Sequence, residues 1–338
     1  MAEVLVTGGS GYLGSWCTLA LLTAGFSVRT TVRDLAREPQ VRAQLLIGGV
    51  DAGESLRVVR ADLQDDAGWR EAVAGCEAVL HVASPTLTRV PRTDDEMVRP
   101  AIDGTLRVLR AARKAGVRRV VMTSAIGAIA YGHAPRDTPF TEQDWTNVDA
   151  DIAPYQRSKT LAERAAWDFV AGEGRGLELS TVNPTGVLGP VLSADYSPSL
   201  IAIARMLDGS MPALLPFATG YVDVRDVAAL HLLAMTEPAA AGERFIATAG
   251  PSLWLRDVAA VLRDRLGERA AKVPTREMPL WAARALSRVN PQVRSLRAAL
   301  GRDLDATAER AERLLGWKPR PIEDTIAETG ESLLALAK

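Results

Sequence analysis

Tyr155 and Lys159 are the two side chains whose types and spacing best suit chemistry in this sequence. They stand four residues apart at the start of a predicted helix, so both project from one helix face. A nearby ammonium group favours tyrosinate and lowers the phenol pKa from about 10 towards working pH. Such a phenol can donate a proton to a carbonyl oxygen while hydride reaches the carbonyl carbon. The pair therefore predicts an acid, Tyr155, and its tuner, Lys159.

A glycine-rich turn near the amino terminus supplies the second chemical feature. Gly9, Gly11 and Gly14 follow an apolar strand and fit the pattern G-x-G-x-x-G. In this pattern the first glycine permits a tight turn, the second lets backbone approach phosphate, and the third lets the helix pack on the strand. An anion then binds the free N–H groups of the helix. We therefore predict a dinucleotide pyrophosphate held by Gly8, Gly11, Tyr12, Leu13 and Gly14.

The end of the second predicted strand, about 20 residues further on, indicates which dinucleotide binds. An acid there bonds the ribose 2′-hydroxyl of NAD, whereas an arginine pairs with the 2′-phosphate of NADP. This chain has both groups, Arg33 and Asp34, and it has Arg37 four residues beyond Arg33. Because guanidinium both binds phosphate and stacks on adenine, we predict NADP (NADPH) held by Arg33.

The elements that must position these residues alternate along the chain. Strands are predicted near residues 4–7, 27–32, 56–61, 77–82, 118–124 and 178–183, with amphipathic stretches near 12–24, 66–74, 94–115 and 153–172. Such alternation predicts an α/β fold of the Rossmann type, a doubly wound parallel sheet covered by helices.

Ligands of such an open sheet bind beyond the carboxyl ends of its strands. The third strand ends at Asp62 and Leu63, where an acidic group could meet the adenine amino group. The fourth ends in Val82, Ala83 and Ser84, followed by a proline that favours a non-helical turn and exposed backbone. All five residues are predicted to bind the cofactor.

The alternation changes after Asn183 and Pro184, where further prolines interrupt the chain. We predict a dinucleotide-binding domain over residues 1–186, with a returning segment over 223–248 that includes a strand near 244–247. Residues 187–222 and 249–338 are predicted to form a smaller substrate-binding lobe with helices near 255–266 and 305–315.

Composition limits the classes of function. With 338 residues, 47% of them hydrophobic, the chain can bury a substantial core. A formal net charge of −1 gives no global field for nucleic acid or a membrane surface, and no apolar run is long enough to span a bilayer. We therefore expect a small-molecule substrate, and the oligomeric state is left open.

Cysteine and histidine positions add two expectations. Cys17 and Cys76 form no disulfide framework and belong to no C-x-x-C pair, so a reducing cytoplasm fits best. His81, His133 and His231 are too scattered to suggest a metal site, and none is predicted.

Together these motifs resemble the extended branch of the short-chain dehydrogenases/reductases. The resemblance is closest to the group of dihydroflavonol reductases, cinnamoyl-CoA reductases and bacterial aldehyde reductases. It rests on VTGGSGYLGSW at 6–16, TVRD at 31–34, YQRSKTLAE at 155–163, NPTGVLGP at 183–190, VDVRDVA at 222–228 and LLGWKP at 314–319. Nearly the whole chain is covered.

The resemblance implies NADPH-dependent reduction of an aldehyde or ketone, with Tyr155 as proton donor and Lys159 also anchoring the nicotinamide ribose. It implies cofactor contacts at Pro184 and Val187. The family usually has a serine that bonds the substrate carbonyl where this chain has Ala125, so Ser124 is our candidate replacement and Thr123 the alternative. A backbone-satisfied, structural Ser124 is the competing interpretation.

The substrate wall is predicted from apolar residues beyond the fifth strand and in the later lobe: Ala125, Ile126, Tyr155, Met206 and Tyr221. Each of these apolar side chains also suits a protein core. Two other functions stay open. One is a nucleotide-sugar epimerase or dehydratase that keeps NAD and uses Arg205 and Arg225 for a second pyrophosphate. The other is a non-catalytic NADP-binding sensor, suggested by Ala125.

Overall fold

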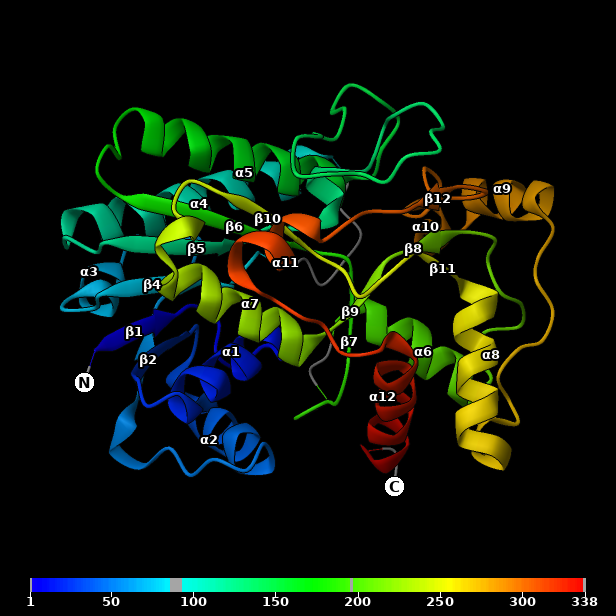
Figure 1. The fold of residues 1–338 in the computed structure, drawn as a ribbon, viewed down its shortest axis with the longest axis horizontal. Helices are drawn as coiled ribbons and strands as arrows, with labels where there is room; N and C mark the ends of the chain where they lie inside the picture. Colours follow the sequence, from blue (N-terminus) through cyan, green and yellow to red (C-terminus); the bar gives the residue numbers. More distant parts are fainter. Residues whose placement is uncertain (1, 86–92, 195–196, 337–338) are drawn as a thin grey trace.

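The computed structural model describes residues 2–85, 93–194 and 197–336 and contains a seven-stranded parallel sheet (Figure 1). Its strands lie in the order β10-β6-β5-β4-β1-β2-β3. Their bounds are β1 Glu3–Val6, β2 Ser27–Val32, β3 Leu56–Arg60, β4 Ala78–His81, β5 Arg119–Thr123, β6 Glu178–Pro184 and β10 Arg244–Ala247. The predicted α/β fold is confirmed, and each predicted strand is present. The strand order reverses between β1 and β4, which is where such sheets bind ligands.

Helices cover both faces of this sheet because side chains alternate along each strand. On β1, Val4 and Val6 belong to one buried cluster and Leu5 to the other. The first cluster includes residues of α1 Tyr12–Thr23, α2 Glu38–Ile47, α7 Val224–Thr236 and α11 Glu309–Leu315. The second includes residues of α3 Trp69–Val73, α4 Asp95–Lys114 and α5 Pro154–Ala171. The sheet is thus buried on both sides, as parallel sheets generally are.

The later part of the chain builds a second group of elements beside the sheet, on the right in Figure 1. A third cluster packs α6 Pro198–Asp208, α8 Leu255–Leu266 and α12 Ile322–Leu336 around β7 Gly186–Leu188 and β9 Tyr221–Asp223, which pair in parallel. The small strands β8 Ala218–Thr219, β11 Leu253–Trp254 and β12 Asp303–Leu304 form a separate sheet. Helices α9 Leu280–Val289 and α10 Pro291–Arg294 complete this group. The predicted division into two domains remains our proposal.

Several helices differ from the sequence-based expectation. Helices α2, α6, α7, α9, α10 and α12 were not predicted. The helix expected over 66–74 begins only at Trp69, because Gly68 precedes it in a left-handed conformation with φ 84°. The helix expected over 305–315 begins at Glu309, since residues 303–304 form β12 and Ala306 bridges to Phe140.

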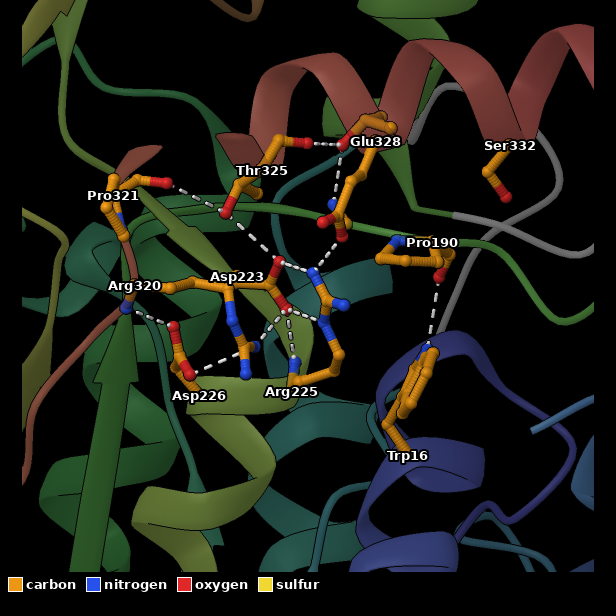
Figure 2. A network of polar contacts seen from close by, with 12 residues as sticks. Trp16, Pro190, Asp223, Arg225, Asp226, Arg320, Pro321, Thr325, Glu328 and Ser332 are labelled. Atoms are coloured by element: carbon orange, nitrogen blue, oxygen red, sulfur yellow. Dashed lines mark hydrogen bonds and ion pairs between the residues drawn. The ribbon is translucent and has the colours of Figure 1, made fainter. Parts of the chain in front are cut away.

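An ion-pair network joins α12 to the start of α7 (Figure 2). Asp223 caps α7 and accepts bonds from Arg225 at 2.7 Å, Arg320 at 3.1 Å and the Thr325 hydroxyl at 3.0 Å. Burial alone would raise the pKa of Asp223, but its bonds with Arg225 outweigh burial and lower the pKa. Arg225 also pairs with Glu328 of α12. The network therefore fixes α12 beside β9, which ends at Asp223.

Candidate active site

The glycine turn lies at the switch point between β1 and β4, and its glycines have different structural roles. Gly8, rather than Gly9, makes the tight turn, with φ 76°. A Cβ on Gly14 would lie 2.2 Å from the Gly8 carbonyl oxygen, and one on Gly9 would lie 2.0 Å from Thr30 Oγ1. Close packing within the protein therefore requires both glycines.

Gly11 differs from these neighbours. Its φ of −82° suits any residue, and a Cβ there would have its nearest contact, the Gly8 carbonyl oxygen, at 3.4 Å. Gly11 also caps α1, whose first turn has no side-chain cap and no acidic residue. The first N–H groups of a helix have no partner within the helix. The space beside Gly11 and these donors together fit the pyrophosphate of a dinucleotide.

Arg33 and Asp34 lie at the end of β2 with different partners. The Asp34 carboxylate accepts the backbone N–H of Ala36 at 3.0 Å, which caps a short 3₁₀ turn. Arg33 is exposed, and within the part of the chain that the structure describes it has no recorded hydrogen bond or ion pair. The Asp34 carboxylate is thus engaged within the protein, whereas the Arg33 guanidinium is available to a ligand. The site therefore fits a 2′-phosphate better than a 2′-hydroxyl.

The ends of β3 and β4 lie where the sequence places the remaining cofactor residues. Asp62 is half-buried and turns its carboxylate to the backbone N–H of Gln64, and Leu63 is buried. Val82, Ala83 and Ser84 form irregular, half-buried backbone. The Thr7 hydroxyl contacts His81 Nδ1 at 3.0 Å and accepts the Ala83 N–H at 2.9 Å, which ties β1 to the end of β4.

Tyr155 occupies the first turn of α5, which begins at Pro154. A Cβ built on Gly127 would lie 3.6 Å from Tyr155 Cε1, so the ring lies against the turn that follows β5. Desolvation raises the pKa of Tyr155 to about 12, and Tyr131 adds a smaller rise. Water at its 47% exposed surface moderates this effect. Lys159 is not among the causes of this shift, so the expected lowering of the phenol pKa by Lys159 is not found in the protein alone.

Lys159 follows one turn later and is buried. Its ammonium donates to the Thr123 carbonyl oxygen at 3.4 Å, at the end of β5. Desolvation lowers the pKa of Lys159 to about 8, and Glu163 opposes that fall. The charge of Lys159 also acts on His81 at the end of β4. Burial and then Lys159 lower the pKa of His81 to about 3, so this histidine is neutral. Lys159 therefore reaches the strand ends where a cofactor of this fold lies.

Ser124, the proposed carbonyl-binding group, is only 2% exposed and donates its hydroxyl to Glu163. Glu163 also accepts bonds from Thr181, Asn183 and Arg244 at 2.7 to 3.0 Å. The network is buried and holds the Ser124 hydroxyl on a carboxylate. A catalytic role for Ser124 remains a prediction, and this contact favours a structural one.

The predicted substrate wall is only partly accessible. Ala125, Ile126 and Tyr221 are buried, and burial followed by Tyr131 raises the pKa of Tyr221. Met206 is 0% exposed, inside the core formed with α8 and α12, so it offers no surface to a ligand. Pro184 ends β6, and Val187 lies in β7, the strand that pairs with β9.

Glu163 belongs to this site but was not predicted from the sequence. It stands four residues after Lys159, a spacing that places it on the same helix face. Tyr131 suits an apolar pocket by residue type, but its proximity to Tyr155 and Tyr221 has no signal in the spacing, because it arises from chain segments far apart. Gln156 bonds Tyr131, which opposes the rise in pKa that burial causes there.

No group of three or more potential metal-binding side chains comes together in residues 2–85, 93–194 and 197–336. In the same ranges no helix combines the length and apolar character needed to cross a bilayer.

A doubly wound parallel sheet, a glycine turn at its switch point and a Tyr–Lys pair on α5 define an extended short-chain dehydrogenase/reductase. Residues 4–247 match the family model described as the NAD dependent epimerase/dehydratase family, and the chain belongs to that family. It is 36% identical over 274 residues to a dihydroflavonol 4-reductase of Zea mays, covering 78% of this chain and 74% of that one. It is 37% identical over 246 residues to cinnamoyl-CoA reductase CAD2 of Medicago truncatula, covering 71% and 74%.

Solved structures share the fold over nearly the full length. Yeast methylglyoxal/isovaleraldehyde reductase Gre2, complexed with NADPH, superimposes with a TM-score of 0.80 at 23% identity and 99% coverage of both chains. A UDP-glucose 4-epimerase of Thermotoga maritima superimposes with a TM-score of 0.76 at 22% identity, covering 99% of this chain and 100% of that one. Reductases and an epimerase thus share this architecture, so the site must decide between these functions.

Proposed function

We propose that this protein is an NADPH-dependent oxidoreductase that reduces an aldehyde or ketone to the alcohol. The observation that carries the proposal is the placement of Tyr155 and Lys159 on α5, beside the strand ends that flank the glycine turn. The named relatives support it, since dihydroflavonol 4-reductase and cinnamoyl-CoA reductase are reductases by name.

The chain's own residues supply proton transfer and binding. At neutral pH Tyr155, with its raised pKa, keeps its proton and can donate it to a carbonyl oxygen. Lys159, with a pKa of about 8, remains mostly charged there and stabilises negative charge that develops on that oxygen or on the phenol. Carbonyl reduction then leaves a tyrosinate that must be protonated again from solvent, which reaches Tyr155 through its exposed surface.

NADPH supplies hydride to the carbonyl carbon when it is bound. The residues that would hold it are the cradle at Gly11, the donors at the start of α1 and Arg33 for the 2′-phosphate. Asp62, Leu63, Val82, Ala83 and Ser84 would line its adenosine and central parts, and Lys159, Pro184 and Val187 its nicotinamide half. Tyr12 would also contribute, and its buried hydroxyl has no partner among the described residues.

The epimerase alternative needs Arg205 and Arg225 to bind a second pyrophosphate, and the contacts of these two arginines make it less favoured. Arg225 pairs with Asp223 and Glu328, and Arg205 donates to Gln292 at 2.9 Å, so both are engaged within the protein. The sensor alternative is motivated by Ala125, and the retained Tyr155 and Lys159 speak against it. Both free cysteines are buried, which supports our proposal of a reducing cytoplasm as the compartment.

The test is a steady-state assay of NADPH oxidation with a panel of aromatic and aliphatic aldehydes and ketones. We expect turnover that prefers NADPH to NADH and is lost in Tyr155→Phe. The control is Thr236→Val, which removes an exposed hydroxyl on α7 outside the proposed site. Absence of any Tyr155-dependent turnover across the panel would refute the proposal, and NAD(H) that co-purifies would favour the epimerase.

A further inference from the structure

A surface pocket of about 420 Å³ lies between α9 and residues 297–302. In Figure 1, α9 is at the right-hand end, whereas α1 with the glycine turn lies to the left. Four arginines line the pocket, two from α9 and two from the chain after α10: Arg284, Arg288, Arg297 and Arg302. Pro135, from the loop that follows Tyr131, forms part of the wall. Positive side chains from separate segments therefore converge on one hollow.

The charge of this pocket is poorly compensated. Residues 278–302 contain five arginines and no aspartate or glutamate. Arg297 pairs with Asp151 at 3.2 Å. Across the described part of the chain, no recorded ion pair neutralises Arg284, Arg288 or Arg302. The carboxyl end of α9 offsets part of the charge of Arg288, which lies in its last turn. It does not account for the other two, whose mutual repulsion opposes folding.

We propose that this pocket binds the phosphate group of a small molecule. Guanidinium groups present planar pairs of donors that match phosphate oxygens, and several of them in one hollow form an anion site. The volume falls within the range of about 300 to 1,000 Å³ that ligand pockets occupy. A bound phosphate would also remove the repulsion among the unpaired arginines.

One apolar cluster forms a wall that connects the pocket to the surroundings of Tyr155. Ala299 and Leu304 belong to the same apolar cluster as Ile126 and Tyr131. The segment between them carries Arg302 on the pocket side. The phosphate could therefore belong to the far end of the substrate or to a separate ligand that acts through this wall. The first source rests on the proposed function, whereas phosphate binding itself does not.

The binding test is calorimetric titration of the full chain with inorganic phosphate and pyrophosphate at constant ionic strength. Saturating NADP fills the dinucleotide site beforehand, so that only a second site responds. We expect millimolar or tighter binding that weakens at least about tenfold in the double variant Arg284→Gln/Arg288→Gln. The charge-conserving Arg284→Lys/Arg288→Lys should keep most of the affinity. Arg313→Gln, which removes an exposed arginine on α11, should bind as the parent does.

Two kinetic arms identify the source of the phosphate. A KM about tenfold lower for glyceraldehyde 3-phosphate than for glyceraldehyde, lost in the double glutamine variant, assigns it to the substrate. A change in the KM of glyceraldehyde on adding inorganic phosphate, without that preference, assigns it to a separate ligand. The proposal is overturned if the parent binds neither phosphate nor pyrophosphate at tens of millimolar, or if the double glutamine variant binds them equally well. Calorimetry needs no turnover, so failure of the reductase proposal is distinguishable.

Discussion

Replacing Ser124 by alanine separates the two roles that this residue can have. Its buried hydroxyl donates to Glu163, and the same carboxylate oxygen also accepts Asn183 Nδ2 at 2.8 Å. A hydrogen bond to a charged group contributes about 1.5 to 3 kcal/mol. Because Asn183 remains as a partner, we expect Ser124→Ala to lower the free energy of unfolding by about 1.5 kcal/mol. For a chain of this length that is a fall in Tm of roughly 2 °C.

The structural and the catalytic role of Ser124 predict different effects of Ser124→Ala on kcat. A structural Ser124 leaves kcat within about twofold, whereas loss of a donor to the reacting oxygen costs about 10² to 10³ in kcat. Thermal unfolding and steady-state oxidation of NADPH measure both quantities on one preparation. The control is Ser180→Ala on β6. It removes a buried hydroxyl that donates to the Ala240 carbonyl oxygen at 2.6 Å. A hundredfold loss of kcat with unchanged Tm would show that the argument from Glu163 is mistaken.

Four further substitutions probe the cofactor cradle and the lysine. Burial holds the pKa of Lys159 at about 8 against 10.5 unfolded, so Lys159→Met should abolish turnover yet raise stability at pH 7 by up to about 3 kcal/mol. In denaturant titrations this gain should shrink between pH 8 and 10.5, because the folded lysine then sheds its buried charge; a constant gain contradicts the assigned burial. Arg33→Gln should weaken NADPH binding more than tenfold in fluorescence titrations and leave NADH unchanged, and equal losses would count against the 2′-phosphate contact. Gly11→Ala should weaken NADPH binding at nearly constant Tm, whereas Gly14→Ala should destabilise the protein by about 1 to 3 kcal/mol because its Cβ meets backbone; the reverse pattern would contradict the assigned cradle.

The sequence predicted the sheet well because strands buried on both faces appear as short apolar runs between turn residues. It did not predict α7 or α12. These helices are fixed by contacts between distant segments, such as Arg225 with Glu328. The Tyr155 and Lys159 pair could be found because both members lie on one helix.

The surroundings of that pair could not be found from local spacing. Glu163 gathers Ser124, Thr181, Asn183 and Arg244 from three other segments of the chain. The raised pKa of Tyr155 likewise depends on packing, which no residue spacing reveals. A predicted role that depends on where a hydroxyl points, as for Ser124, therefore needed the structure.

The bonds between Asp223, Arg225 and α12 also constrain the order of events during synthesis. Strand β9 and the start of α7 are made about a hundred residues before Thr325 and Glu328, which complete their bonding. A nascent chain that has left the ribosome only to residue 300 can pair β1 to β6 but leaves the Asp223 carboxylate without Arg320 and Thr325. The contacts that hold β9, the strand of Tyr221, beside α12 therefore stay incomplete until then. The dinucleotide cradle should consequently mature on the ribosome before the surroundings of Tyr221 do.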